Sequence, residues 1–277
     1  MLFLSWRNIV VPRVRVGGAA WGVCLGLLLL GRLVCFADGT NLLPAVTIDL
    51  AKPSVMTGTF YEIGSDRKKI LFKYRRSAKR DGDNVQVEQL FTLPDGSVAC
   101  RERIHYRNDM MVSYEMEDPR ADTQGSILIE RDPKKPKRER ILLRHVEQQG
   151  AKITKSTEIL QPNTLISDTI YPFILTRWDE LMLGGVVKFH LISLDPPDVF
   201  NFRLQKEGET TWEGKPVVRI RMEPTNLIVA HFIKPIYFLI ETAAPHRVFS
   251  YTGRTTPQAK VDGAWKFVEA EAVFDWK

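Results

Sequence analysis

A two-residue alternation of apolar and polar side chains recurs along most of this chain and restricts what it can fold into. In KKILFKYRRSAK (68–79), Ile70, Phe72 and Tyr74 share one face, whereas Lys73 and Arg75 share the other. Successive side chains of a β-strand point to opposite sides of a sheet, so this period predicts a half-buried strand. The same alternation is present in residues 83–93, 97–106, 109–116, 186–194, 199–207, 215–223, 246–254 and 265–276.

Residues that favour tight turns separate the first of these segments: Asp81-Gly82, Pro94-Asp95-Gly96 and Asn108-Asp109. Short turns of this kind join antiparallel neighbours, so consecutive segments predict a meander with one apolar face. No low-complexity segment or long linker divides the pattern. The fold class that we predict is mainly β: a long antiparallel meander that forms a curved sheet or half-barrel, in a single β-rich domain over residues 55–277.

SDTIYPFILTRWDELMLGG (167–185) is the one stretch with a clearly helical pattern, and Gly184-Gly185 follows it as glycine commonly follows a helix. On a helical wheel its apolar side chains cover an arc of about 200°. They are Ile170, Tyr171, Phe173, Ile174, Leu175, Trp178, Leu181 and Met182. An arc this wide predicts contact with more than one surface. We therefore predict one principal α-helix at about 168–183 that covers the concave side of the sheet.

Arg177 falls inside this apolar arc and allows two interpretations. Its guanidinium either extends to solvent or pairs with a carboxylate of the protein, such as Glu102 on the apolar side of segment 97–106. Alternatively, it binds an anionic headgroup beside an apolar cleft. On the second interpretation the ligand-binding residues are Phe173, Ile174, Arg177, Trp178 and Leu181.

The first 37 residues have the organisation of an export signal. Four arginines and no acidic residue accompany an apolar run from Ala19 to Leu30, and Cys35-Phe36-Ala37 gives the segment a small-x-small ending that suits signal peptidase. The run is shorter than the roughly 20 residues of a membrane-spanning helix. We predict a signal peptide over 1–37 with cleavage near Ala37, an uncleaved anchor being the alternative, and a lead-in segment over 38–54. The mature protein is then periplasmic or secreted and has no integral membrane domain.

Removing the signal leaves 35 Lys and Arg residues against 33 Asp and Glu residues. This balance is weak evidence for a nucleic-acid partner, and we expect none. Basic residues nevertheless gather in 67–80, which contains eight Lys and Arg residues and no acidic residue, and in 131–144. Lysine-rich outer faces keep sheets soluble, so a solvated face is expected. The alternative is contact with an anionic surface such as lipid headgroups or envelope polysaccharide.

Sequence motifs for catalysis or metal binding are missing. The five histidines show no metal-ligand spacing, and there is no C-x-x-C, no G-x-S-x-G and no phosphate-binding glycine loop. Cys100 is the single cysteine of the predicted mature chain, and it lies on the apolar face of a strand, where a buried, unreactive thiol is expected. We therefore predict no enzymatic activity, no cofactor and no metal site.

Several segments resemble exported β-rich bacterial families of unknown function: GTFYEIG, LMLGGVVKFHL, TWEGKPVVRIRMEP and APHRVFSYTGR. The layout is also similar to the curved sheet and helix of periplasmic lipoprotein-carrier proteins, which hold acyl chains in an apolar trough. The resemblance implies an envelope setting and an apolar ligand. We predict an exported, non-enzymatic envelope protein that binds a lipid-like or other apolar ligand, or another envelope component, in its concave sheet. The alternative is a structural or assembly factor of the envelope with a solid core and no ligand cavity.

Overall fold

The computed structural model describes residues 49–147 and 152–276. The chain divides into two units, residues 1–46 and 47–277, and every described residue belongs to the second. The predicted signal peptide and residues 38–48 of the predicted lead-in lie outside the described residues. Of the remaining lead-in, Leu50 and Ala51 are buried in the core of the second unit.

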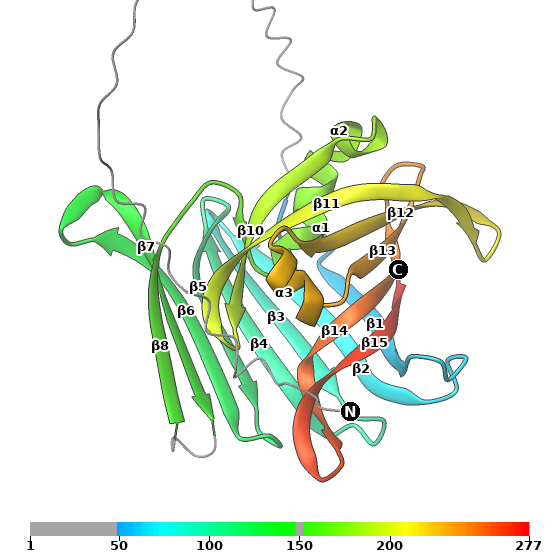
Figure 1. Cartoon of the computed structure of the whole chain (residues 1–277), viewed down its shortest axis with the longest axis horizontal. Helices are drawn as coiled ribbons and strands as arrows, with labels where there is room; N and C mark the ends of the chain where they lie inside the picture. The colour runs from blue at the N-terminus through cyan, green and yellow to red at the C-terminus, as the bar shows by residue number, and fades with distance from the viewer. Residues whose placement is uncertain (1–48, 148–151, 277) are drawn as a thin grey trace, which may run out of the picture. The chain divides into compact units, whose positions relative to one another are not determined.

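This unit is built on one sheet of 15 strands. One meander comprises β1–β8 and another comprises β10–β15, and the pairing of β1 with β15 joins the two (Figure 1). Every strand pair is antiparallel except β9 with β10. The strands are β1 Val55–Glu62, β2 Ile70–Asp81, β3 Asn84–Thr92, β4 Val98–Arg107, β5 Met110–Asp118, β6 Thr123–Asp132, β7 Lys135–Glu147, β8 Lys152–Ile159, β9 Thr164–Leu165, β10 Val186–Leu194, β11 Pro197–Trp212, β12 Lys215–Pro224, β13 Ile236–Glu241, β14 Val248–Val261 and β15 Ala264–Asp275.

The predicted fold class is confirmed, and so are the turns that set it up. Gly82 lies between β2 and β3 with a φ of 55°. Asn108 and Asp109 have φ values of 50° and 56°, which is the geometry that a two-residue hairpin turn needs. The turn chemistry in the sequence therefore determines which segments become neighbours in the first meander.

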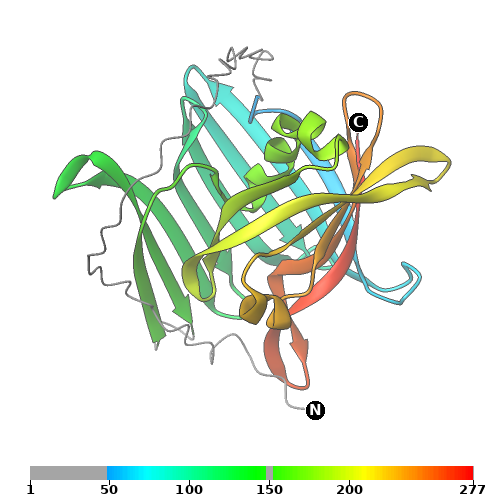
Figure 2. The same cartoon turned by 45° about the horizontal axis from the view of Figure 1, so that its top comes forward.

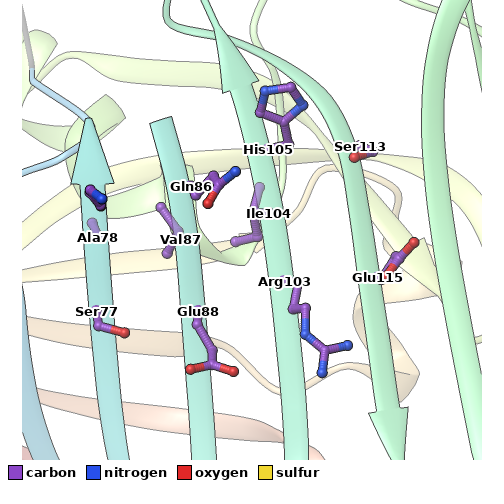
Figure 3. A pocket seen from close by; sticks show the side chains of 11 residues that line it. Ser77, Ala78, Gln86, Val87, Glu88, Arg103, Ile104, His105, Ser113 and Glu115 are labelled. Carbon is purple, nitrogen blue, oxygen red and sulfur yellow. The ribbon is translucent and has the colours of Figure 1, made fainter. Parts of the chain in front are cut away.

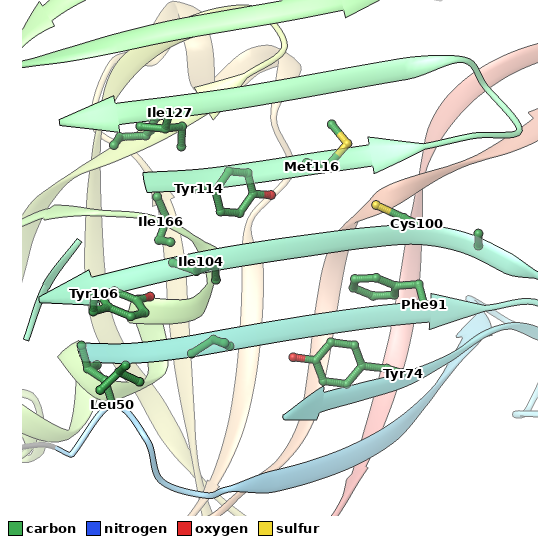
Figure 4. Close-up of a cluster of buried hydrophobic side chains, with 14 of the residues drawn as sticks. Leu50, Tyr74, Phe91, Cys100, Ile104, Tyr106, Tyr114, Met116, Ile127 and Ile166 are labelled. Carbon is green, nitrogen blue, oxygen red and sulfur yellow. The ribbon is translucent and has the colours of Figure 1, made fainter. Parts of the chain in front are cut away.

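The two sides of the sheet differ as the alternation requires. We call the side that carries Phe72, Tyr74, Val87 and Ile104 the inner face; these side chains are buried. Figure 4 shows Tyr74 and Ile104 among its buried side chains. The opposite side, which carries exposed residues such as Lys73, is the outer face. Aromatic rings from five strands pack together on the inner face, with ring centroids 4.9 to 6.4 Å apart. They belong to Phe60, Tyr74, Phe91, Tyr251 and Phe274.

The second meander returns over the first. In Figures 1 and 2, β10 and β11 cross in front of the first meander, and both strands lie against β7. Gly125 of β6 permits a close approach, because a Cβ atom there would overlap the side chain of Leu194 at the end of β10. The sheet stays open, with β8 and β9 as its edges.

Three helices accompany the sheet in the described part of the chain: α1 Ser167–Thr176, α2 Trp178–Met182 and α3 Leu227–Phe232. The single helix predicted over 168–183 is thus two helices, which separate at Arg177. The Arg177 N–H donates to the carbonyl oxygens of both Phe173 (3.2 Å) and Ile174 (3.1 Å), so the last turn of α1 tightens there. The interruption separates α1 from α2, which packs on β10 and β11.

Candidate functional site

The five residues predicted to bind a ligand lie on α1 and α2 but have different surroundings. The side chains of Ile174 and Leu181 are completely buried, at 0% exposure, whereas Phe173 and Trp178 are half-buried. The Phe173 ring lies 5.8 Å from that of Phe189, and the Trp178 ring stacks on His246 with centroids 4.1 Å apart. The protein's own residues therefore make the principal contacts of this apolar group.

Arg177 is exposed and forms an ion pair on the helical segment itself. Its Nη2 lies 2.5 Å from Oε2 of Glu180, and the Arg177 side chain is 44% exposed. The interpretation in which Arg177 extends to solvent or pairs with a protein carboxylate therefore holds, but the carboxylate is Glu180. It is not Glu102, whose side chain is buried on the inner face. The break in the helix accounts for this orientation, since a wheel drawn through Arg177 assumes a continuous helix.

Asp168, in the first turn of α1, is the main polar contact between the helices and the inner face. Its carboxylate accepts hydrogen bonds from Arg76 Nε (2.7 Å), Gln89 Nε2 (2.7 Å) and the Tyr106 hydroxyl (2.9 Å), which come from β2, β3 and β4. The Arg76 guanidinium also donates to the carbonyl oxygens of Leu50 (2.8 Å) and Pro53 (2.9 Å). All four side chains are buried, so the network fixes α1 on three strands at once.

Sequence reasoning assigned Arg76 to a basic run and missed its role. The signal was present in the alternation, because Arg76 has the same parity as Phe72 and Tyr74 and therefore had to point inward. An inward arginine requires a buried carboxylate. That carboxylate is Asp168, at the start of the predicted helix.

Glu102 is a second buried acid on the inner face, and its carboxylate has no strong partner. It is 0% exposed, and neither carboxylate oxygen accepts a well-formed hydrogen bond from the described residues. Burial raises the pKa of Glu102 to about 7, although the nearby hydroxyls of Thr256 and Tyr114 oppose the rise. Cys100, two residues away, is buried as predicted, and burial raises the pKa of its thiol. A thiol in this setting is a poor nucleophile.

A third group lies where β7 meets the β10–β11 turn. Candidate metal-ligand atoms of His145, Glu147 and Asp195 lie within 4.8 Å of one another. Two cationic groups adjoin them: Lys152 Nζ is 3.7 Å from Glu147, and Arg254 Nη2 is 3.7 Å from Asp195. These cations offset the two carboxylates, so the cluster has the charge balance of an ionic network between the two meanders. The prediction that the protein has no metal site stays a prediction.

The outer face carries a shallow depression over β2–β5, with a volume of about 490 Å³ (Figure 3). Its polar lining includes exposed Lys79, Glu88, Arg103 and Glu115. The remaining lining residues are Ser77, Ala78, Gln86, Val87, Ile104, His105 and Ser113. Sequence reasoning did not find this depression, because it depends on which strands are neighbours and not on any one segment.

Across residues 49–147 and 152–276, no helix has both the length and the apolar character that crossing a membrane requires. No protein family matches the sequence, and no curated protein matches it either.

Two solved structures are similar to this chain at a low level. One is a β-barrel-like protein of the domain of unknown function DUF1849 from Brucella abortus, with 6% identity and a TM-score of 0.36 over 79% of this chain and 92% of that chain. The other is a DUF1329 family protein from Desulfovibrio piger ATCC 29098, with 10% identity and a TM-score of 0.25 over 82% of this chain and 85% of that chain. Likeness at this level assigns neither an activity nor a ligand.

Proposed function

We propose that this chain is an exported, non-enzymatic protein of the cell envelope that acts through its surfaces as a structural or assembly factor. The observation that carries the proposal is the burial of the inner face by the chain's own elements. At one end, Asp168 binds residues of β2, β3 and β4. At the other, Leu194 packs on Gly125. A ligand on the inner face would have to displace these contacts.

Two features of the sequence support the remaining parts of the proposal. The basic and apolar segments of residues 1–37 favour export. The missing catalytic motifs favour a role without chemistry. The fully buried Glu102, whose carboxylate lacks a strong partner, does not favour catalysis, since a general acid or base must reach its substrate.

The second candidate function is the binding of a lipid-like ligand beside α1 and α2. Phe173 and Trp178 favour it, because both remain half-buried next to the completely buried Ile174 and Leu181. Apolar and aromatic side chains of this kind typically line the pockets that bind apolar ligands. If this second function is correct, the ligand contacts the half-buried side chains of α1 and α2, and Arg177 contacts its headgroup.

Native mass spectrometry of the protein purified from its own envelope distinguishes the two candidates. For a structural factor we expect the mass of a chain that begins after Ala37, without a lipid adduct. A stoichiometric lipid that is lost in Trp178→Ala but kept in Leu183→Ala would establish the second candidate instead. Leu183 is a suitable control, because it follows α2 and is 89% exposed. An unprocessed chain found outside the envelope fraction would refute both.

A further inference from the structure

We propose that the outer face of β2–β5 binds an acidic polysaccharide. In this proposal Lys73, Arg75 and Lys79 hold its negative charges, and the adjoining depression holds its hydroxyl groups. The inference rests on the proposed function, an envelope protein that acts through its surfaces, and it names the class of partner that this surface binds. It follows from three features of this face. Its cations along β2 are unpaired, its depression is lined by both hydrogen-bond donors and acceptors, and it has few groups that suit other anionic partners.

The cations form a row along β2. Lys73, Arg75 and Lys79 are exposed on the outer face, on the opposite side from Phe72 and Tyr74. At about 3.3 Å per residue, the row extends over roughly 20 Å of the strand. Such a row can contact several charges of an extended polymer at the same time.

These cations have no partners within the described part of the chain. Other cations of the same basic run have ion-pair partners: Lys69 pairs with Glu62, and Arg80 pairs with Asp49 and Asp109. No ion pair involves Lys73, Arg75 or Lys79 among residues 49–147 and 152–276. Their charges are therefore available to an external anion without the loss of an internal ion pair.

The depression beside the row is organised by the strand register. Ser77, Glu88, Arg103 and Glu115 lie opposite one another across β2, β3, β4 and β5. In the next row, Lys79 lies opposite Gln86, which lies opposite His105, which lies opposite Ser113. The side chains project from neighbouring strands on one side of the sheet (Figure 3).

This lining contains both donors and acceptors, and that composition indicates the kind of ligand. Lys79 and Arg103 only donate, Glu88 and Glu115 only accept, and the hydroxyls of Ser77 and Ser113 do both. A ligand that is anionic throughout would be repelled by the two carboxylates. Hydroxyl groups, which donate and accept, complement such a mixture. A sugar polymer with acidic groups meets both requirements: hydroxyls for the depression and charges for the cation row.

Other anionic partners fit less well. The large apolar residues of the depression, Val87 and Ile104, are buried, so they cannot insert into a bilayer. Glu88 and Glu115 would also face the anionic headgroups. Single-stranded nucleic acid usually stacks on exposed aromatic rings, and the lining contains no Phe, Tyr or Trp.

The test measures binding of the full mature chain to three probes: polygalacturonate, neutral dextran and phosphatidylglycerol vesicles. We expect binding to polygalacturonate that weakens with salt, and little binding to dextran or vesicles. The variant Lys73→Gln/Arg75→Gln/Lys79→Gln should raise the dissociation constant for polygalacturonate at least about tenfold, which corresponds to 1.4 kcal/mol. Gln86→Ala, in the depression, should weaken binding without a change in its salt dependence.

The matched control is Lys134→Gln/Lys137→Gln/Arg138→Gln, which removes three exposed cations from the β6–β7 hairpin. It should leave binding unchanged within about twofold, a difference below 0.5 kcal/mol. The inference is overturned if the control weakens binding as much as the β2 variant, if vesicles bind better than polygalacturonate, or if polygalacturonate does not bind. In each case a processed, lipid-free chain in the envelope fraction would leave the proposed function standing.

Discussion

The buried carboxyl of Glu102 should make the stability of this protein depend on pH, and Glu102→Gln should remove that dependence. Burial raises the pKa of Glu102 from 4.5 to about 7 in the folded state. Below about pH 4.5 the carboxyl is protonated in both states and imposes no penalty. As pH rises from there to 7, the unfolded chain loses the proton while the folded chain keeps it, so the unfolding free energy falls. Above pH 7 the penalty is fully developed.

The size of the effect follows from the pKa difference. A difference of about 2.5 pKa units corresponds to roughly 3 kcal/mol at 1.36 kcal/mol per unit. Between pH 5 and pH 8 we expect a change of about 2–3 kcal/mol, because part of the penalty is already present at pH 5. A glutamine fills nearly the same space and cannot ionise. Glu102→Gln should therefore stabilise the protein at pH 8 more than at pH 5 by this amount.

Urea unfolding of the wild type and Glu102→Gln at pH 5 and pH 8 measures the difference directly. The control is Glu115→Gln, which removes an exposed carboxylate from the outer face of β5, and we expect it to change the unfolding free energy by less than about 0.5 kcal/mol at either pH. The reasoning is refuted if the effect of Glu102→Gln is the same at both pH values. It is also refuted if Glu102→Gln is more favourable at pH 5 than at pH 8.

Three further predictions concern contacts that hold the unit together. Asp168→Asn leaves the buried Arg76 guanidinium without its counter-charge, so it should lower the unfolding free energy measured in urea by about 3–5 kcal/mol. The control Arg177→Gln removes only an exposed ion pair and should lower it by less than about 1 kcal/mol. Gly125→Val should destabilise by at least about 1–3 kcal/mol because its side chain overlaps Leu194, and Leu194→Ala in the same chain should recover part of the loss; a Gly125→Val protein as stable as wild type would contradict the close packing. Zn²⁺ or Mn²⁺ should leave the melting temperature unchanged if the His145 group is an ionic network, and a saturable increase would instead identify a metal site.

The first meander follows from the sequence because its contacts are local. In β2–β5 each strand pairs with the next one along the chain, so the alternation determines the faces and the turns determine the register. The pairing of β1 with β15 joins segments more than 200 residues apart, such as Phe60 and Ala272, and no local pattern specifies it. The same limit applies to the outer depression, whose lining comes from four strands.

The helical segment shows a different limit. Its existence and apolar character follow from the period of its residues, but a helical wheel assumes one axis. The helix is interrupted at Arg177, and this arginine of the predicted apolar arc is exposed to solvent. Arg76 shows the reverse error: it was grouped with neighbouring cations by charge, although its parity placed it with Phe72 on the inner face. The position of Arg76 in the two-residue alternation was the stronger evidence, because it determines which face of the sheet the side chain lies on. A run of charged residues describes only composition.

The polar groups of the inner face also explain how this unit can fix α1 without a covalent link. Cys100 is the single cysteine among the described residues, so no disulfide can tie the helix to the sheet there. Apolar contacts alone specify the position of a helix weakly, because many apolar surfaces are equivalent. The Asp168 carboxylate is satisfied only where Arg76, Gln89 and Tyr106 converge, and any shift of α1 would leave buried charges unpaired. The arrangement that positions α1 thus also holds it over the inner face. A partner would therefore contact the outer face, where Lys73, Arg75 and Lys79 are exposed and have no partners among the described residues.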